Sequence, residues 1–162
     1  MEALNKNSSP SSDCEIVNSR IINAPREIVF KAWRDPAHLK NWWGPKGFTN
    51  TFKEFDFQPN GKWSFVMHGP DKKGNYTNKC VFVKILKPEL IIWDRITNPK
   101  FQVVVTFEDL KNDTTRVTFK MVFDSPEACN KLRSFAPDKN EENLDKLEAE
   151  IKLMSNHKPE PE

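Results

Sequence analysis

The feature that most constrains the fold is the run Asn41-Trp42-Trp43-Gly44-Pro45, in which two adjacent tryptophans end at a Gly-Pro pair. Gly44 has no Cβ and can adopt backbone conformations closed to other residues, whereas Pro45 fixes its own φ and donates no backbone hydrogen bond. Pro45 also moves Gly44 away from the helical region. The run therefore predicts a rigid corner that holds a large apolar surface, either as a staple on the core or as the rim of a pocket.

Length and charge limit the classes of protein to which the chain can belong. With 162 residues it is about one domain long and can bury a sizeable core. Charged residues make up 30% of the chain, yet the net charge is only +2, because lysines are interleaved with acids. A nucleic-acid binder usually carries a clustered basic stripe, so we expect no nucleic-acid partner.

The apolar runs and the cysteines indicate a cytoplasmic protein. The longest apolar runs, such as residues 90–93, have only the length of a strand, so no membrane span is expected. The N-terminus is polar and lacks the apolar segment of a secretory signal. Cys14, Cys80 and Cys129 are odd in number and widely spaced, which fits a reducing compartment.

Two terminal segments differ in composition from the rest of the chain. Residues 1–13 and 155–162 are polar and rich in Ser, Asn or Pro, and we expect them to be disordered tails. One domain is then predicted over residues 14–154.

Within that domain, a strand and two short helices precede a long stretch with the period of two that is typical of strands. The first strand covers residues 14–22. Pro25 opens the first helix, and the second runs from Pro36 to about Trp42. Six further strands are expected at residues 49–57, 62–67, 76–85, 89–96, 101–110 and 114–124.

The last of these strands indicates the kind of sheet. Val117, Phe119 and Met121 alternate with Thr118 and Lys120, so one face is buried and the other is wet. This alternation is typical of an antiparallel sheet that is solvated on one side.

After the sheet, Ser125-Pro126 begins a short helical segment that Pro137 is expected to break. A final helix is predicted from about Asn140 to Met154, with one apolar stripe. The stripe consists of Leu144, Leu147, Ile151 and Met154. The order β-α-α-β×6-α predicts an α+β fold in which this helix covers the apolar face of the sheet.

The chain resembles a known family in several motifs that occur in a fixed order. They are Ala32-Trp33…Trp42-Trp43-Gly44-Pro45, Phe55-Asp56-Phe57…Gly61-Lys62-Trp63, Phe107-Glu108-Asp109…Thr114-Thr115-Arg116-Val117-Thr118 and Asn140-Glu141-Glu142-Asn143-Leu144-Asp145-Lys146-Leu147. The element order resembles the helix-grip fold of the START-like (SRPBCC) superfamily. The motifs resemble the family named after the C-terminal domain of the activator of the heat-shock-protein-90 ATPase, over about residues 14–153.

The resemblance implies a curved antiparallel sheet that grips a long C-terminal helix, with a cavity between them that often takes an apolar ligand. The eukaryotic activator also has an N-terminal domain, with an Asn-Trp-His-Trp element, that docks on the chaperone. Nothing similar precedes Cys14 in this sequence. The missing element argues against activation of the chaperone and makes the chaperone a doubtful partner.

Three functions remain open, and the first is the binding of an apolar small molecule in that cavity. Its mouth would be formed by Trp42, Trp43 and Phe48. Its walls would be formed by Trp63, Phe65, Met67, Phe82, Val103, Val105, Phe107, Phe119 and Met121 of the strands and by Leu144, Leu147 and Ile151 of the final helix. Such pockets are mostly apolar, but the same alternation is shown by any half-buried sheet with a filled core.

The second function is catalysis, because the superfamily includes aromatase/cyclases and hydrolases that use the cavity. His38 and His68 show no metal-ligand spacing. Asp94 and Arg95 are adjacent in a strand and point to opposite faces, so only one of them can line a cavity. Cys80 has no basic neighbours of the kind that favour a thiolate. We predict no catalytic residue, metal site or cofactor.

The third function is that of a protein-interaction module, either as a partner of the chaperone or as a dimer. The mixed charges of residues 139–152, with the pair Glu148–Lys152, are typical of a solvated helix face. An exposed Trp42-Trp43 surface would favour a homodimer. For each of the three functions, we expect either Trp42 or Trp43 to anchor the corner on the core and the other to lie nearer the mouth of the cavity. The sequence does not specify which of them is the anchor.

Overall fold

The computed structural model describes residues 14–70 and 74–156, in an order of one strand, two helices, six strands and two helices. The segments 1–13 and 157–162, predicted as tails, lie outside the described residues. The elements are β1 (Glu15–Ile22), α1 (Arg26–Arg34), α2 (Pro36–Trp42), β2 (Thr49–Phe55), β3 (Lys62–His68), β4 (Asn75–Leu86), β5 (Leu90–Arg95), β6 (Phe101–Asp109), β7 (Thr115–Val122), α3 (Pro126–Arg133) and α4 (Ala136–Asn156).

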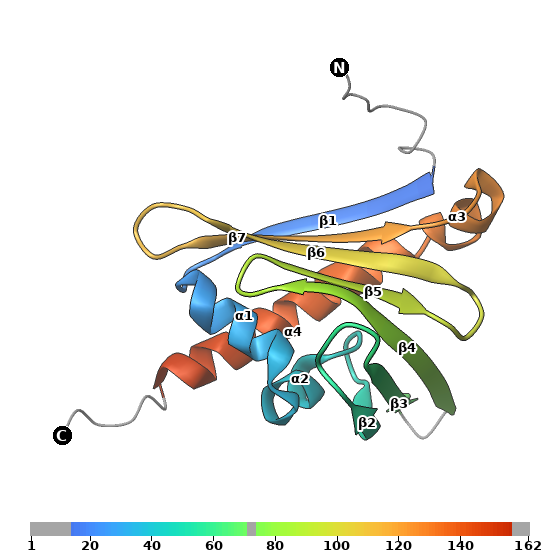
Figure 1. Ribbon diagram of the computed structural model, residues 1–162, viewed down its shortest axis with the longest axis horizontal. Coiled ribbons are helices and arrows are strands. Elements are labelled where there is room, and N and C mark those ends of the chain that lie inside the picture. Colours follow the sequence, from blue (N-terminus) through green and yellow to red (C-terminus); the bar gives the residue numbers. More distant parts are fainter. Residues whose placement is uncertain (1–13, 71–73, 157–162) are drawn as a thin grey trace, which may run out of the picture.

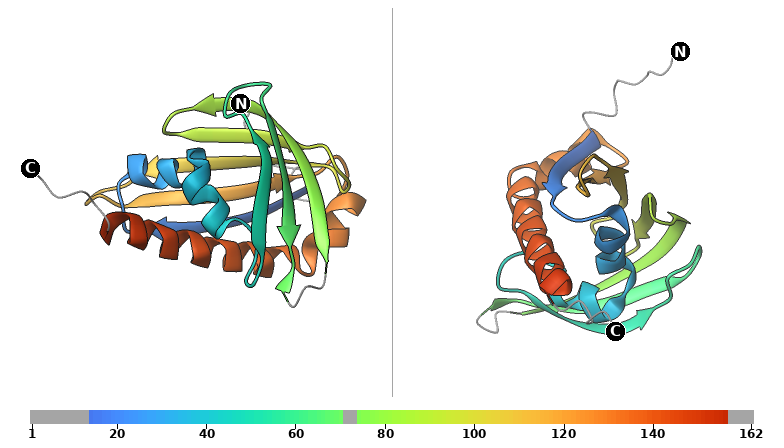
Figure 2. Two further views of the ribbon diagram at one scale, coloured as in Figure 1. Left: turned by 90° about the horizontal axis from the view of Figure 1, so that it is seen from below. Right: turned by 90° about the vertical axis from the view of Figure 1, so that its left-hand side faces the viewer.

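The strands form one seven-stranded antiparallel sheet in the order β1-β7-β6-β5-β4-β3-β2. The first strand therefore pairs with the last one, while the remaining strands follow one another as a meander. The sheet curves strongly, and the long helix α4 runs along its concave side (Figures 1 and 2). The predicted α+β helix-grip architecture is confirmed.

The concave face of the sheet is apolar and packs against the helices. Along β7, Val117, Phe119 and Met121 are buried while the residues between them are partly exposed, as the period of two predicts. From the other side, the stripe of α4 buries Leu144 and Leu147. Helices α1 and α2 contact α4 and lie on the same side of the sheet (Figure 2). The core therefore lies between one curved sheet and a layer of helices.

Helix α4 begins earlier than the sequence predicts. We expected Pro137 to break the preceding segment and the helix to start near Asn140, but α4 begins at Ala136. Pro137 lies in the first turn, where a backbone N–H has no intrahelical acceptor and its loss costs no hydrogen bond. The helix also continues to Asn156, two residues into the segment predicted as a tail.

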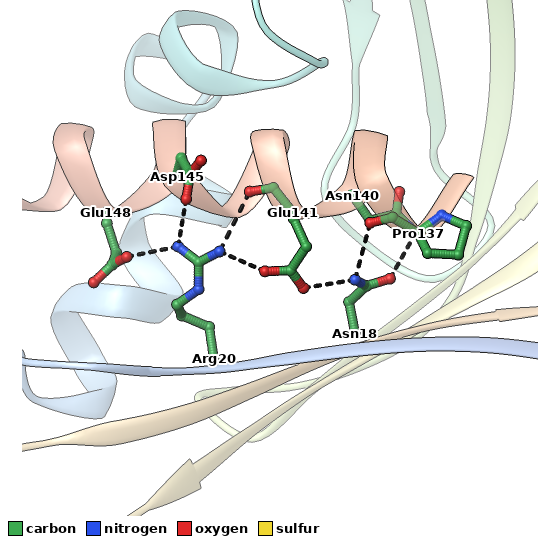
Figure 3. Close-up of polar contacts among 7 residues, drawn as sticks. All are labelled: Asn18, Arg20, Pro137, Asn140, Glu141, Asp145 and Glu148. Carbon is green, nitrogen blue, oxygen red and sulfur yellow. Dashed lines mark hydrogen bonds and ion pairs between the residues drawn. The ribbon is translucent and has the colours of Figure 1, made fainter. Parts of the chain in front are cut away.

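Arg20 of β1 binds three carboxylates of α4 (Figure 3). Its Nη1 donates to Asp145 at 2.8 Å and to Glu148 at 2.7 Å, and its Nη2 donates to Glu141 at 2.7 Å. Burial by itself lowers the pKa of Arg20, but the hydrogen bonds with these carboxylates outweigh it and raise the pKa above its usual range. The helix face that we interpreted as solvated is thus partly used to hold the edge strand.

Asn18, two residues before Arg20, extends this contact toward the start of α4 (Figure 3). Its side-chain amide donates to Glu141 Oε2 at 2.6 Å and to the carbonyl of Pro137 at 3.1 Å, and its oxygen accepts from Asn140 at 3.1 Å. The hydrogen bond from Asn18, followed by that from Arg20, holds the pKa of Glu141 below its usual value. The first turns of α4 are therefore fixed over β1 by a continuous polar network.

Replacing Arg20 by Met should lower the free energy of unfolding by about 2 kcal/mol, because three carboxylates on one helix face would lose their shared cation. Chemical denaturation measures the change. Arg116→Met is the control, since Arg116 pairs with Glu108 on an exposed surface and should cost less than about 1 kcal/mol. Equal losses in the two variants would contradict a special role for the Arg20 network.

Candidate ligand pocket

The corner after α2 requires glycine at position 44. Trp43 ends α2 in an extended conformation, and Gly44 follows with φ +105°, a backbone conformation that side chains disfavour. A Cβ at Gly44 would also lie only 2.9 Å from Met67 Cε. The rigid corner predicted from the Gly-Pro pair is thus present, and it brings the chain close to β3.

Side chains of α4 bind the backbone of this corner. Asn143 Oδ1 accepts a buried hydrogen bond from the Gly44 N–H at 3.1 Å. Lys146 Nζ donates to the carbonyls of Pro45 at 3.2 Å and Phe48 at 3.1 Å. Burial lowers the pKa of Lys146. These contacts satisfy backbone groups that a corner outside regular structure leaves without partners.

The two tryptophans of the corner take different positions. Trp42 is 1% exposed, and its indole N–H donates to the carbonyl of Ala32 at 3.0 Å. Trp43 is partly buried and lines a pocket, where its ring lies 5.2 Å from that of Trp63 and 5.7 Å from that of Trp93. Trp42 is therefore the anchor of the corner, and Trp43 faces the pocket.

The pocket is half-enclosed and has a volume of about 140 Å³. It lies between the corner, the concave face of strands β3 to β7 and the first two turns of α4. Its apolar wall consists of Trp43, Pro45, Phe65, Met67, Trp93, Phe101, Val103, Phe119 and Met121. Gly44, Asn78, Cys80, Arg95, Lys139, Asn140 and Asn143 complete the lining.

Arg95 is a partly buried cation of this lining. Its Nε donates to the carbonyl of Pro99 at 3.0 Å, its Nη2 to the carbonyl of Asn98 at 3.2 Å, and its Nη1 to the side-chain oxygen of Asn78. The guanidinium also lies over the ring of Phe101, 5.7 Å from its centre. Burial lowers the pKa of Arg95, yet a guanidinium remains charged in proteins.

Cys80 lies opposite Arg95 in the register of β4 and β5. Burial raises the pKa of the Cys80 thiol to about 12, although the nearby Arg95 acts in the other direction. The thiol is therefore protonated at neutral pH and is not a nucleophile.

Several residues predicted as ligand contacts do line the pocket: Trp43, Phe65, Met67, Val103, Phe119 and Met121. The others are not part of its lining. Trp42, Trp63, Phe82, Val105, Phe107, Leu144, Leu147 and Ile151 are buried in the core, and Phe48 packs near Tyr76. Helix α1 covers Phe107, because Phe30 and Trp33 pack on it with ring centres 5.1 and 5.9 Å away. Phe55 of β2 packs instead on Trp63 and Phe82, with ring centres 5.8 and 5.7 Å away.

The polar part of the lining was not predicted from the sequence, although a signal was available. With a period of two, Asn78 and Cys80 share a strand face with Phe82, and Arg95 shares one with Trp93. Of the adjacent pair, Arg95 lines the pocket, whereas Asp94 accepts a hydrogen bond from Gln102. The contributions of Lys139, Asn140 and Asn143 depend on the placement of α4, which no local pattern specifies.

Other candidate groups lie outside this pocket. His38 Nδ1 lies 2.9 Å from Glu150, and His68 contacts Thr51 and Asn75 at the end of β3. Among residues 14–70 and 74–156, no three His, Cys, Asp or Glu side chains gather into a group that could hold a metal. None of the helices in the same residues combines the length and hydrophobicity needed to cross a bilayer.

The curved antiparallel sheet closed by a long C-terminal helix defines a START-like helix-grip domain. Residues 23–152 match the family described as "Activator of Hsp90 ATPase homolog 1-like protein", and the chain belongs to that family. Among curated proteins, none matches the chain in sequence.

Solved structures of bacterial proteins share this fold. A Nitrosomonas europaea protein is 19% identical with a TM-score of 0.81, and the match covers 90% of this chain and 99% of that one. An Arthrobacter aurescens protein is 21% identical with a TM-score of 0.81, covering 98% and 100%. The AHSA1-like protein of Aeromonas hydrophila is 15% identical with a TM-score of 0.72, covering 91% and 99%. At these identities the likeness shows the fold alone.

Trp42→Ala should lower the free energy of unfolding by about 4 kcal/mol, because it opens a closed cavity and leaves the Ala32 carbonyl without its donor. Trp43→Ala should cost about 2 kcal/mol, since the space that it opens joins a pocket reached by water. Chemical denaturation of both variants measures the difference. Equal losses would show that the two tryptophans do not divide the roles of anchor and pocket wall.

Proposed function

We propose that this START-like domain binds a small apolar molecule in the pocket between the corner, the sheet and α4. The observation that carries the proposal is an aromatic-walled pocket of about 140 Å³ beside an otherwise packed core. An apolar cavity of about 150 Å³ suffices to bind benzene, whereas pockets for drug-sized ligands have about 300–1,000 Å³. The ligand is accordingly a compound of about one ring, or a short chain.

The chemistry of the lining supports binding over catalysis. General acid–base catalysis needs a group whose pKa lies near the working pH. The thiol of Cys80 is protonated, with a pKa of about 12, and the guanidinium of Arg95 is charged. These groups, with Asn78, supply hydrogen bonds that orient a ligand. The free cysteines, Cys14 among them, support a reducing, cytoplasmic setting for this binding.

Toluene is a suitable neutral probe, and its binding can be followed by the fluorescence of the tryptophans in the wall. The wild-type protein should bind toluene saturably. Val103→Phe, which adds a ring to the pocket wall, should weaken this binding about tenfold or more, because the added ring fills the space of the ligand.

Val104→Phe is the matched control, since Val104 is the next residue of β6 and lies on the other face of the sheet. It should bind toluene as the wild type does. Thermal melting confirms that both variants fold. The proposal fails if the wild type binds no toluene, or if a folded Val103→Phe variant binds it unchanged.

A further inference from the structure

The charged side chains that line the pocket indicate the charge of its ligand, which the apolar wall does not. The lining contains two cationic side chains, Arg95 and Lys139, and no carboxylate. The chain as a whole carries a net charge of only +2, so this excess is local and does not reflect the average composition. A pocket with positive groups at a few points of an apolar wall is complementary to an anion with an apolar body.

Arg95 has no counter-ion among residues 14–70 and 74–156. Its hydrogen bonds go to two backbone carbonyls and to the amide oxygen of Asn78, all of them neutral. Among the described residues, no carboxylate forms an ion pair with Arg95, and the neighbouring Asp94 is bound to Gln102 instead. The thiol of Cys80 is protonated and supplies no negative charge. A partly buried cation without an anion is costly, and a bound anion would relieve that cost.

The guanidinium of Arg95 also has N–H groups that are not used by the hydrogen bonds described above. It carries five N–H groups, and three are used by Asn78, Asn98 and Pro99. Two N–H groups have no acceptor within the described part of the chain, and Arg95 is part of the pocket wall. The two oxygens of a carboxylate can accept both, in charge-assisted hydrogen bonds that are about twice as strong as neutral ones.

Lys139 extends the positive field to the mouth of the pocket. Its side chain is 53% exposed, and its Nζ lies 3.9 Å from Glu142, a long separation for an ion pair. Glu142 also accepts a hydrogen bond from the backbone of Lys46. Lys139 is thus only weakly neutralised, and it attracts anions to the opening.

From these observations we propose that the ligand is a small ring compound with a carboxylate, which Arg95 binds while the ring lies against the aromatic wall. This inference rests on the proposed function and names its ligand class. Arg95 also anchors the loop between β5 and β6 through Asn98 and Pro99. A purely structural anchor would give no preference between charged and neutral ligands, so charge selectivity separates the two roles.

Three probes of the same shape measure this selectivity: 4-methylbenzoate, 4-methylbenzyl alcohol and 4-methylbenzylamine, titrated at neutral pH by calorimetry. The wild type should bind the carboxylate about tenfold more tightly than the alcohol, and the amine most weakly. Arg95→Gln should bind the carboxylate and the alcohol equally. Arg116→Gln, which removes the same charge from an exposed ion pair outside the pocket, should keep the preference of the wild type.

The inference is overturned if the wild type binds the alcohol as tightly as the carboxylate, or if Arg95→Gln keeps the preference. Should Arg95→Gln fail to fold, the ranking in the wild type and in Arg95→Lys, which keeps the charge, decides the matter. Toluene binding without a preference for the carboxylate would leave the proposed function standing and remove only this inference. A failure of toluene and of all three probes would remove both.

Discussion

The pocket depends on the hydrogen bonds by which α4 holds the corner after α2. A chain that turns at Gly44-Pro45 leaves backbone groups without partners, and burying them alone would be costly. Asn143 and Lys146 supply those partners and so fix the distance between the helix and the corner. Helix α4 is itself held by Arg20 of β1 at the far edge of the sheet. One helix thereby connects the edge strand, the corner and the pocket wall.

The concave face of the sheet is divided between packing and a pocket. Phe30 and Trp33 of α1 fill one half, together with Phe107. The other half faces the first turns of α4, where asparagine and lysine side chains replace the apolar stripe. The pocket is small because α1 packs on part of the concave face, and it is positive because Arg95, the last residue of β5, is part of its lining. Its size and its charge therefore arise from different elements.

The fold could be predicted largely from local patterns, and the site only in part. Periods of two indicate the strands, because burial on one face of a sheet produces an alternation of apolar and polar residues. The caps at Pro25 and Ser125 indicate where helices begin. Arg20 lies in the first strand and Glu141 in the last helix, so the two residues are far apart in the sequence. No local pattern therefore predicts their contact. The residues that line the pocket were likewise predicted only where a local pattern indicates them. Aromatic residues such as Phe65 were predicted from alternation, whereas the choice between core and pocket depended on how α1 and β2 pack over the concave face.

The central claim is that this pocket receives a small ring carboxylate through Arg95. A crystal structure of the protein with bound 4-methylbenzoate tests it most directly. We expect the ring among Trp43, Trp93 and Phe119, with both carboxylate oxygens within hydrogen-bonding distance of the Arg95 guanidinium. A ring bound outside this pocket, or a carboxylate directed to solvent with Arg95 still bound only to neutral oxygens, would contradict the claim.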